Sequence, residues 1–517
     1  MRDERALSGQ HVVVLGLARQ GTALARWLIG QGAQVTVSDV RPADALVEAL
    51  RSLEGLPIRF ELGGHPLALL ARCDLLCLSG GVPTDQPIVV EAQKRGIPLA
   101  NDAQLFLERC PAQVIGITGS SGKTTTTTLV GAMGQAAGRT TWVGGNIGNP
   151  LIGDLDAMTS SDLVVMELSS FQLELMTSSP SIAAILNITP NHLDRHPSME
   201  AYLAAKARIL DFQSAHDVAV LGYDDPAAQS LSGRVRGKVF FFGRGEVGDG
   251  SRLPHDGSHL LHASRLPHDG SHLLHTRVKD KQVVLVKDKE VPVCALNDIQ
   301  LRGEHNVLNV LAACALADAA GIAPEAMRQA IAGFTGVAHR LQLVREVDGV
   351  RYYDDSIATT PERLIAALQA FHEPIVLLAG GRDKHLPWDE AAGLIQRRVR
   401  RLIVFGEMGE LVERAVRQSA SGDASHTASH TASHTVSHTV SHTVSHTASD
   451  TASDTASDTA SHTLIQRVEA LAEAVKRAAE AARPGDVVLL APGGTSFDAF
   501  KDFAERGDRF QEYVRAL

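Results

Sequence analysis

The chain alternates short apolar runs with longer segments in which apolar residues recur at helical spacing. Such alternation is typical of βαβ units, in which parallel strands are covered by helices on both faces. The pattern restarts near Pro111 and near Phe334, and it therefore predicts an α/β fold of three domains, over residues 1–110, 111–333 and 334–517. The expected strands are residues 11–15, 34–38 and 75–78 in the first block, 113–117, 163–166 and 183–187 in the second, and 351–354, 375–379, 401–405 and 486–490 in the third. A helix is expected over residues 22–31.

Two repeats interrupt this pattern. Residues 251–263 are repeated almost letter for letter at 264–276, and a four-residue repeat covers residues 425–463. Together they hold thirteen of the 22 histidines, which leaves metal binding as one interpretation. However, Ser and Thr are poor helix formers, and three of the short repeats carry Asp in place of His. We therefore expect solvated loop insertions that lie outside the folded domains.

Composition and charge narrow the class of protein. The chain of 517 residues is 44% hydrophobic and 21% charged, as in soluble globular proteins. Its net charge of -10 lacks the basic excess that holds nucleic acid, so any phosphate site must be local. Its five cysteines form no paired CxxC knuckles, which favours reduced thiols in the cytoplasm. The first ten residues are polar, and no stretch is apolar enough for a membrane span, so we expect neither export nor insertion.

The strongest chemical signal is GITGSSGKTT at residues 116–125, between an expected strand and an expected helix. A loop in that position directs backbone N–H groups at phosphate oxygens, and it adds a Lys charge and a Thr hydroxyl for Mg²⁺. It departs from the common P-loop because Ile117 stands at the place of the first Gly. We expect ATP or GTP to bind here. The expected phosphate-binding residues are Gly119, Ser120, Ser121, Gly122, Lys123, Thr124 and Thr125.

Two other strands of the second block end in polar residues. Glu167 follows one of them, where a P-loop enzyme places a metal-binding acid, and the sequence NITPNHLD, which contains His192, ends the other. Open α/β sheets bind ligands at the carboxyl ends of their strands. Three such strand ends in one domain therefore strengthen the functional interpretation of each.

The first block carries a weaker nucleotide signal. GLARQG at residues 16–21 follows a strand, and Asp39 ends the next one, close to the spacing of a dinucleotide fingerprint. Ala18 replaces the Gly that lets the backbone approach a pyrophosphate, which argues against a tight NAD site and against a dehydrogenase. A modified nucleotide site and a purely structural Rossmann-like domain both remain open.

Five motifs in order, TGSSGKTT, MELSSFQLE, LNITPNHLD, YLAAKARIL and GEHNVLN, resemble those of the Mur ligase family. These are ATP-dependent, amide-bond-forming enzymes of peptidoglycan precursor synthesis. GLARQG, DDSIATT, GGRDK and SFDAFKDFAERGDRF are most similar to the members that add D-glutamate to UDP-N-acetylmuramoyl-L-alanine. The resemblance implies a Rossmann-like N-terminal domain, a central P-loop ATPase-like domain with a mostly parallel sheet, and a C-terminal Rossmann-like domain.

The resemblance also implies a reaction. ATP phosphorylates the substrate carboxylate, the amine of D-glutamate attacks the acyl phosphate, and a tetrahedral intermediate gives the amide and phosphate. Lys123 and Mg²⁺ would neutralise the γ-phosphate first. The implied catalytic residues are Lys123, Glu167, His192, Lys206 and Arg340. The implied metal ligands are Thr124, Glu167, His192 and Lys206, the last as a carbamate formed with CO₂, because a bare ammonium would repel Mg²⁺.

Binding residues follow from the same motif matches. For ATP they are, besides the phosphate loop, Asn306, Arg340 and Asp355; for the UDP substrate Arg19, Gln20, Asp39, Arg41, Ser79, Asn146 and His192; and for D-glutamate Thr359, Lys384, Ser496 and Phe503. One departure concerns Ile357, which stands where the D-glutamate-adding members commonly have Lys. A charged nucleotide contact is therefore lost or moves to another residue.

The expected cofactors are thus ATP and Mg²⁺, and the expected partners are UDP-N-acetylmuramoyl-L-alanine and D-glutamate, with no nucleic acid. We expect a cytoplasmic monomer. Two other hypotheses are another amide ligase of the superfamily, such as a folylpolyglutamate synthase, and a switch protein that binds ATP without ligation. A switch gives no reason for Arg340 and Lys384 at strand ends of the third block.

Overall fold

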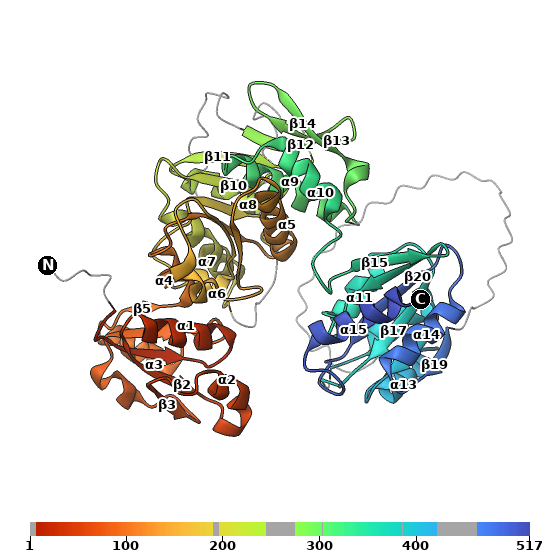
Figure 1. Cartoon of the computed structure of the whole chain (residues 1–517), viewed down its shortest axis with the longest axis horizontal. Helices are drawn as coiled ribbons and strands as arrows, with labels where there is room; N and C mark the ends of the chain where they lie inside the picture. Colours follow the sequence, from red (N-terminus) through yellow and green to blue (C-terminus); the bar gives the residue numbers. More distant parts are fainter. Residues whose placement is uncertain (1–6, 190–195, 245–273, 302, 385, 421–462) are drawn as a thin grey trace, which may run out of the picture. The chain divides into compact units, whose positions relative to one another are not determined.

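The computed structural model describes residues 7–189, 196–244, 274–301, 303–384, 386–420 and 463–517 (Figure 1). The chain divides into two compact units, Met1–Thr335 and Gly336–Leu517. The described residues form three sheets, two in the first unit and one in the second. Each sheet is mostly parallel, which confirms the α/β class predicted from the sequence.

The first sheet has the strand order β3-β2-β1-β4-β5 and is parallel throughout. Its strands are β1 His11–Leu15, β2 Gln34–Asp39, β3 Ile58–Leu62, β4 Leu75–Leu78 and β5 Leu99–Ala100. The accompanying helices are α1 Arg19–Gly30, α2 Val47–Ser52, α3 Pro87–Lys94 and α4 Asp102–Leu107, with 3₁₀ turns η1 Ala43–Leu46 and η2 Leu67–Arg72. Alternate residues of β1 face opposite layers, because Val12 and Val14 pack with α1, and Val13 and Leu15 pack with α3.

The second sheet has nine strands in the order β14-β13-β12-β11-β10-β9-β6-β8-β7. They are β6 Gln113–Thr118, β7 Thr141–Gly145, β8 Leu163–Glu167, β9 Ile182–Ile185, β10 Val218–Gly222, β11 Lys238–Phe242, β12 Leu274–Lys279, β13 Gln282–Val286 and β14 Glu290–Ala295. Its helices are α5 Lys123–Ala136, α6 Ser170–Leu173, α7 Met199–Asp211, α8 Pro226–Ser230, α9 Glu304–Ala319 and α10 Pro324–Gly333, with 3₁₀ turns η3 Leu151–Gly153, η4 Leu155–Ala157, η5 Leu231–Arg234 and η7 Leu296–Asp298. The strands β6 and β8 are buried along most of their length, as parallel strands covered on both faces must be.

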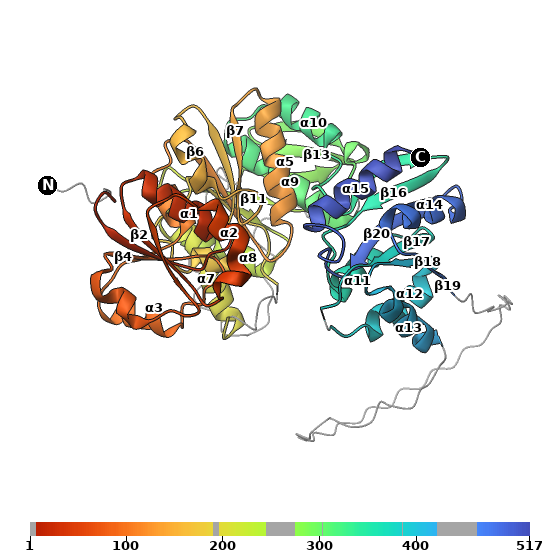
Figure 2. The ribbon, with the colours of Figure 1, turned by 60° about the horizontal axis from the view of Figure 1, so that its bottom comes forward.

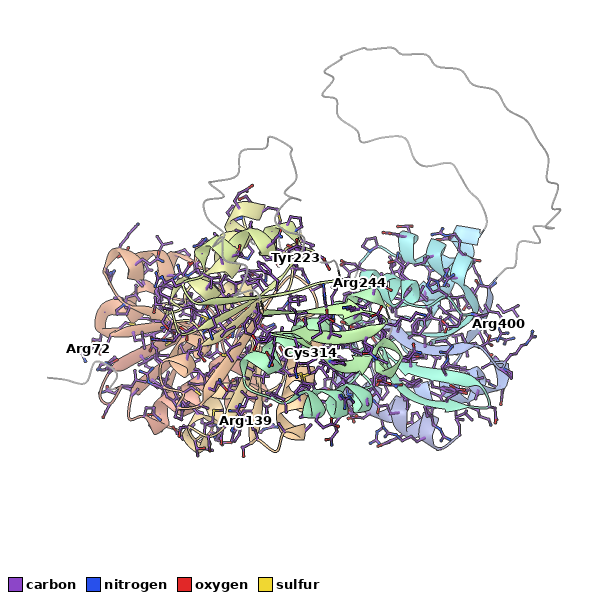
Figure 3. All side chains as sticks on the ribbon, turned by 90° about the horizontal axis from the view of Figure 1, so that it is seen from above. Arg72, Arg139, Tyr223, Arg244, Cys314 and Arg400 are labelled. Atoms are coloured by element: carbon purple, nitrogen blue, oxygen red, sulfur yellow. The ribbon has the colours of Figure 1, made fainter. Side chains whose placement is uncertain are left out.

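Arg139, labelled in Figure 3, connects two strands of this second sheet to the end of one of its helices. Its guanidinium donates to Gln113 Oε1 at 3.1 Å, to the carbonyl of Asp162 at 3.1 Å and to the carbonyl of Ala320 at 3.3 Å. The last contact satisfies a carbonyl at the C-terminal end of α9, where backbone acceptors have no partner within the helix. One side chain thus fixes the starts of β6 and β8 against the end of α9.

The third sheet lies in the second unit and has the order β15-β16-β20-β17-β18-β19. Its strands are β15 Gln342–Val347, β16 Val350–Asp354, β17 Ile375–Gly380, β18 Val399–Phe405, β19 Leu464–Arg467 and β20 Val487–Gly493. The helices are α11 Pro361–Gln369, α12 Asp389–Arg398, α13 Gly409–Ala420, α14 Leu471–Ala481 and α15 Phe503–Arg515. Figure 2 shows α11, α12 and α13 on one face of this sheet and α14 and α15 on the other.

The alternation of β17 explains these two layers. Ile375, Leu377 and Ala379 pack against α11, α12 and α13, whereas Val376 and Leu378 pack against α14 and α15. Successive side chains of a strand point to opposite faces, so a continuous apolar run buries both.

The structure corrects the sequence prediction in three places. The first helix begins at Arg19 rather than near Thr22. The strands β12, β13 and β14 pair antiparallel, although the sequence pattern predicts no strand over these residues. The tandem repeat does not end outside the fold, because its last three residues begin β12, and Thr276 donates from its hydroxyl to Leu311 O at 2.7 Å. Thr463, the last residue of the second insertion, is likewise buried.

Candidate active site

The predicted phosphate loop lies between β6 and α5 and is packed against α9 through a glycine. Gly122 has φ of +80°, and a Cβ added there would lie 2.2 Å from Asn309 Oδ1 on α9. Gly is therefore required for both backbone conformation and space. Because the first N–H groups of α5 have no partner within the helix, this loop and helix start form the arrangement that binds phosphate.

Contacts with the end of β9 fix the conformation of this loop. Ser120 N donates to Asn187 O, and Ser121 N donates to Asn187 Oδ1, each over 2.9 Å. The Lys123 ammonium folds back over the loop and donates to Gly119 O at 2.9 Å and to Ser120 O at 3.3 Å. The cation is thus held where a phosphate in the loop would meet it.

Glu167 ends β8 and accepts hydrogen bonds from two neighbouring side chains. Its side chain is buried, with 2% of the residue exposed. Thr124 donates from its hydroxyl to Glu167 Oε2, and Asn146 donates from its amide to Glu167 Oε1, each at 2.8 Å. Arg19 of the first sheet's α1 donates to Asn146 O at 3.4 Å. Residues predicted to hold metal and UDP substrate therefore form one connected set.

Lys206 points from α7 into the same place. It is 2% exposed, and its ammonium donates to Gly119 O at 2.9 Å and to Thr118 Oγ1 at 3.3 Å. The ammonium also lies 4.7 Å from the centroid of the Tyr202 ring. Burial and repulsion by Lys123 lower the pKa of Lys206 to about 7, although the charge of Glu167 acts in the opposite direction.

A second histidine of the HLDRHP segment lies near this cluster, and the sequence analysis did not single it out. His196 is 2% exposed, and its Nε2 lies 2.9 Å from Ser170 Oγ while its Nδ1 lies 3.1 Å from Glu174 Oε1. Its ring stacks on Phe171 with centroids 5.3 Å apart. The predicted ligand His192 lies outside the described residues.

Asn306 lies in the first turn of α9 and is paired with a residue one turn further along the helix. Asn309 donates from its amide to Asn306 Oδ1 at 2.9 Å, and the Asn309 Oδ1 lies 3.5 Å from Thr126 Oγ1 of α5. Both amides thus stand beside the helix that follows the phosphate loop. The spacing of three residues on a helix is the signal that could have identified Asn309 as the partner of Asn306.

The predicted UDP-contacting residues of the first sheet surround the turn after β1. Asp39 accepts hydrogen bonds from Leu17 N at 2.6 Å and from the Arg41 guanidinium at 2.8 Å and 3.0 Å. Burial alone would raise the pKa of Asp39, but these hydrogen bonds lower it to about 2. Gln20 Oε1 accepts from Gly80 N at 3.2 Å, and the neighbouring Ser79 is buried.

A cavity of about 900 Å³ opens beside two of these residues. Its lining includes Arg19 and Arg41, together with Trp27 on α1 and Pro150 and Asp156 of the second sheet's domain. Gln20, Asp39 and Ser79 are not part of that lining. The five predicted UDP contacts of the first sheet's domain thus fall into two groups: Arg19 and Arg41 line the cavity, whereas Gln20, Asp39 and Ser79 lie at the turn after β1.

In the second unit, two predicted ATP contacts lie within one short region. Leu341 N donates to Asp355 Oδ1 at 3.0 Å. Burial raises the pKa of Asp355 to about 7, although the Leu341 N–H and the charge of Arg340 act to lower it. Arg340 is exposed, and its backbone N–H donates to Val337 O at 3.0 Å.

Of the predicted D-glutamate residues, Thr359 lies in the loop between β16 and α11, and Lys384 and Phe503 contact this loop. The Lys384 ammonium donates to Thr359 Oγ1 at 3.3 Å, and Ser496 is buried while Phe503 is 36% exposed. Burial and the charges of Arg363 and Arg506 lower the pKa of Lys384. The region around Lys384 therefore carries the positive charges of three side chains, Lys384, Arg363 and Arg506.

Known proteins resemble the chain along its whole length. The family models of the Mur ligase MurD-like N-terminal domain, the Mur ligase middle domain and the Mur ligase glutamate ligase domain match residues 10–101, 117–317 and 339–441. The UDP-N-acetylmuramoylalanine--D-glutamate ligase of Symbiobacterium thermophilum is 38% identical over 98% of both chains. The enzyme of the same name from Acetivibrio thermocellus is 34% identical over 99% of this chain and 98% of its own. The chain belongs to the Mur ligase family.

Solved structures agree with this Mur ligase fold. The UDP-N-acetylmuramate-alanine ligase of Thermotoga maritima superimposes with a TM-score of 0.50 at 20% identity, covering 98% of this chain and 99% of that one. MurF of Acinetobacter baumannii gives a TM-score of 0.51 at 16% identity, covering 98% of this chain and 92% of its own. The three-domain fold of the Mur ligases, predicted from the sequence, is thereby confirmed.

The oxygen donors of this Mur ligase fit a Mg²⁺ ion. The Glu167 carboxylate and the Thr124 hydroxyl are oxygen ligands of the kind that Mg²⁺ prefers, whereas Asn146 turns its amide N–H toward Glu167. Among the described residues, no group of three or more His, Cys, Asp and Glu side chains gathers as a metal site. Also within the described part of the chain, no helix combines the length and apolarity needed to cross a membrane.

Sequence reasoning missed one buried cation in this Mur ligase. Arg506 of α15 is fully buried, and its guanidinium donates to Ser356 Oγ at 3.0 Å, to Ser356 O at 2.9 Å and to Gly494 O at 3.1 Å. Burial lowers its pKa to about 10. It connects the end of β20 to the loop after β16, where Asp355 and Thr359 lie. The signal was present as the first of two arginines in ERGDRF, but an arginine on a helix is usually exposed.

Proposed function

We propose that this Mur ligase joins D-glutamate to UDP-N-acetylmuramoyl-L-alanine at the expense of ATP, in peptidoglycan precursor synthesis. The observation that carries the proposal is the 38% identity over 98% of both chains to a relative named for that reaction. The arrangement of Lys123, Glu167 and Lys206 around the phosphate loop supports it.

The residues fit a phosphoryl transfer followed by an acyl transfer. A carboxylate oxygen of the UDP substrate attacks the γ-phosphorus, the bond to the ADP oxygen breaks, and ADP leaves. The amine of D-glutamate then attacks the acyl carbon and gives up a proton, and inorganic phosphate leaves with the electron pair of the C–O bond. Both anions approach each other, so charge neutralisation by Lys123 and Arg340 stabilises the transition state.

Mg²⁺ would supply further positive charge at the γ-phosphate when bound. We assign the binding of one Mg²⁺ to Thr124 and Glu167, and the binding of a second Mg²⁺ to His192. Asn146 holds the second oxygen of Glu167 and orients it. We assign Asn146, and Arg19, which donates a hydrogen bond to Asn146 O, to the binding site for the UDP substrate.

We also propose that Lys206 is carbamylated. The neutral amine attacks CO₂, a C–N bond forms, and one proton leaves to solvent. Because the pKa of Lys206 lies at about 7, a substantial fraction of the amine is neutral at physiological pH and can react. The anionic product would replace a buried ammonium that is repelled by Lys123, and it could hold a cation.

For D-glutamate, we assign Lys384, Thr359, Ser496 and Phe503, with Lys384 as the partner of a carboxylate. Arg363 stands beside Ile357, the position that lacks the common Lys, because its Nη1 donates to Ile357 O at 3.3 Å. We assign to Arg363 the charged contact that Ile357 does not make. Asp355 and Asn306 remain the proposed contacts of the ATP ribose and adenine.

The remaining expectations stay proposals. We propose domain limits of 1–110, 111–333 and 334–517, a monomer, and a cytoplasmic location. The five cysteines are free thiols in the structure, which suits a reducing compartment.

The test is phosphate release from ATP by the pure full-length protein with Mg²⁺, UDP-N-acetylmuramoyl-L-alanine and D-glutamate. We expect release to require all components, and mass spectrometry to find the new amide. L-Glutamate in place of D-glutamate serves as the matched control, and Lys123→Ala should abolish turnover while the circular dichroism spectrum is retained.

Other outcomes identify the rival functions. Release with a folate acceptor but not with the UDP substrate would indicate a folylpolyglutamate synthase. Slow hydrolysis that ignores every acceptor would indicate a switch. For the carbamate, Lys206→Ala should be inactive and partly rescued by acetate, and activity insensitive to both would remove that assignment.

A further inference from the structure

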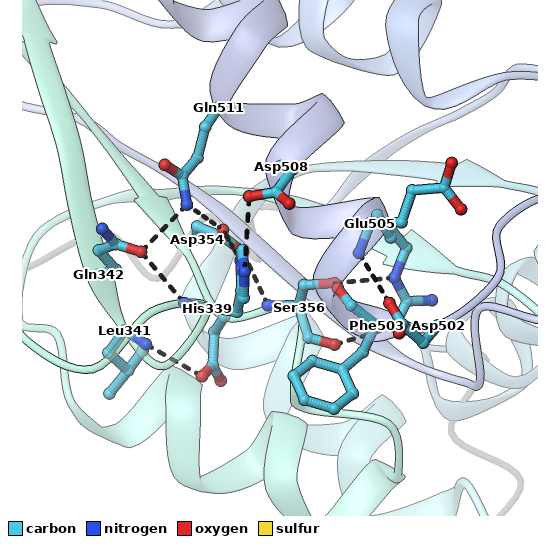
Figure 4. A network of polar contacts seen from close by, with 12 residues as sticks. His339, Leu341, Gln342, Asp354, Ser356, Asp502, Phe503, Glu505, Asp508 and Gln511 are labelled. Atoms are coloured by element: carbon cyan, nitrogen blue, oxygen red, sulfur yellow. Dashed lines mark hydrogen bonds and ion pairs between the residues drawn. The ribbon is translucent and has the colours of Figure 1, made fainter. Parts of the chain in front are cut away.

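His339 is the centre of a closed hydrogen-bond network at the start of the second unit (Figure 4). Its Nδ1 lies 2.8 Å from Asp354 Oδ2, and the same oxygen accepts from Gln511 Nε2 at 2.9 Å. Gln511 Nε2 also donates to Gln342 Oε1 at 3.0 Å, and that oxygen accepts from His339 N at 3.1 Å. The side chains of His339, Asp354, Gln511 and Gln342, together with the backbone N–H of His339, thus form a closed ring that includes the buried Asp354 carboxylate.

Helix α15 closes this network from the other side. A Cβ added to Gly507 would lie 2.0 Å from His339 Nδ1, so the helix backbone touches the imidazole directly. The ring of Phe503 meets the imidazole edge to face with centroids 6.2 Å apart, and Asp508 Oδ1 lies 3.7 Å from Nε2. His339 is therefore held on all sides and is only 7% exposed.

The residues on both sides of Arg340 are anchored, while Arg340 is exposed. His339 has φ of +62° and Leu341 has φ of +43°, both in the left-handed region that non-glycine residues rarely adopt. Ile357 N donates to His339 O at 3.1 Å, and Leu341 N donates to Asp355 Oδ1 at 3.0 Å. The turn that carries Arg340 is thus tied twice to the loop after β16.

We propose that His339 is a positioning residue, whose hydrogen bonds to Asp354 and to the loop after β16 hold the strained turn that presents the Arg340 guanidinium to the γ-phosphate of ATP. The proposal rests on the proposed function for the role of Arg340. The contacts of His339 on which the proposal is based all join residues of the second unit, and none of them involves a ligand.

The first measurement separates kcat from KM. His339→Ala should lower kcat about 100-fold, as expected when a group that stabilises a transition state is displaced. KM for the UDP substrate should stay unchanged. His339→Gln, whose amide can still donate to Asp354, should recover part of the loss. His372→Ala, which alters an exposed histidine of the same unit, should behave as wild type.

The second measurement is a double-mutant cycle with Arg340, and it does not need turnover. Wild type should bind a non-hydrolysable ATP analogue more tightly than ADP, because Arg340 contacts the γ-phosphate. His339→Ala and Arg340→Ala should each reduce this preference, and the double variant should lose no more than Arg340→Ala alone. If His339 only stabilised the fold, its substitution would instead weaken the binding of the ATP analogue and of ADP equally.

The outcomes are distinct. Losses that multiply in the double variant, or a His339→Ala protein with unchanged kcat and nucleotide preference, would overturn the proposal. If His339→Ala shows no cooperative thermal transition, the same cycle with His339→Gln decides. Failure of the proposed function would show itself separately, since wild type and His372→Ala would then both fail to form the amide.

Discussion

Lys123 and Lys206 donate hydrogen bonds to the same carbonyl oxygen, that of Gly119, and each N···O distance is 2.9 Å. The two ammonium groups come from different helices, α5 and α7, and meet at the first residue of the phosphate loop. Their mutual repulsion, added to the burial of Lys206, lowers the pKa of Lys206 to about 7. Lys123 can thus bind phosphate as a cation, whereas Lys206 loses its proton more readily than an ordinary lysine.

Because Lys206 is buried, we expect a neutral residue in its place to stabilise the protein by an amount that depends on pH. Below pH 7 the lysine is charged in both folded and unfolded chains, so the cost of burying the charge is fully present. Between pH 7 and 10.5 the folded chain gives up a proton that the unfolded chain keeps, and the stability of the wild type rises with pH. Lys206→Met should therefore raise the melting temperature at pH 6 in CO₂-free buffer, and this gain should shrink toward pH 10.

The control for this experiment is Lys238→Met, which alters an exposed lysine at the start of β11 in the same unit. Its effect on the melting temperature should be small and independent of pH. A gain from Lys206→Met that does not change between pH 6 and pH 10 would contradict the pKa assigned to Lys206.

Substitution of two glycines with nearly equal φ can distinguish the cost of backbone strain from the cost of steric contact. Gly122 has φ of +80° and a Cβ there would lie 2.2 Å from Asn309 Oδ1, whereas Gly138 has φ of +75° with nothing within 4 Å. Gly138→Ala should cost about 1 kcal/mol of stability, from the left-handed conformation alone. Gly122→Ala should cost clearly more and should abolish ATP binding, measured by calorimetry and nucleotide titration. Equal effects would show that the contact with α9 does not matter.

Arg506 should be among the most sensitive positions of the second unit. Arg506→Met removes three hydrogen bonds and leaves their acceptors buried, so we expect a loss of about 3 kcal/mol or more. Arg509→Met, on the same helix, removes only an exposed pair with Glu512 and should leave the stability almost unchanged. Thermal unfolding of the two variants measures the difference, and a tolerant Arg506→Met would refute the structural role.

The four-residue repeat gives a prediction about function by deletion. Removing residues 425–462 should leave kcat and KM nearly unchanged if the repeat is a solvated insertion. Thr463 must be kept, because its hydroxyl donates to Val399 O at 2.9 Å from a buried position. Thr463→Val should accordingly destabilise the protein by about 1 kcal/mol. Loss of activity after the deletion would show that the repeat has a function of its own.

The strands could be predicted well because their signal is local. The limits of β1 and β4 agree with the expected 11–15 and 75–78, since each is a compact apolar run with polar neighbours. The start of α1 at Arg19 could not be predicted, because Ala18 offers no capping side chain that would mark it. The strand β12 was hidden, because it begins inside a repeat whose composition favours loops.

The sequence by itself determined the fold class, the phosphate loop and the identity of most candidate side chains, because strand and helix periodicity and short motifs depend on neighbours along the chain. It could not determine that Lys206 shares an oxygen with Lys123, or that Arg506 is buried. Nor could it determine that His339 and Leu341 hold the turn around Arg340. Only the tertiary structure decided these relationships, because burial, repulsion between charges and hydrogen bonding depend on distances between residues that are remote in sequence.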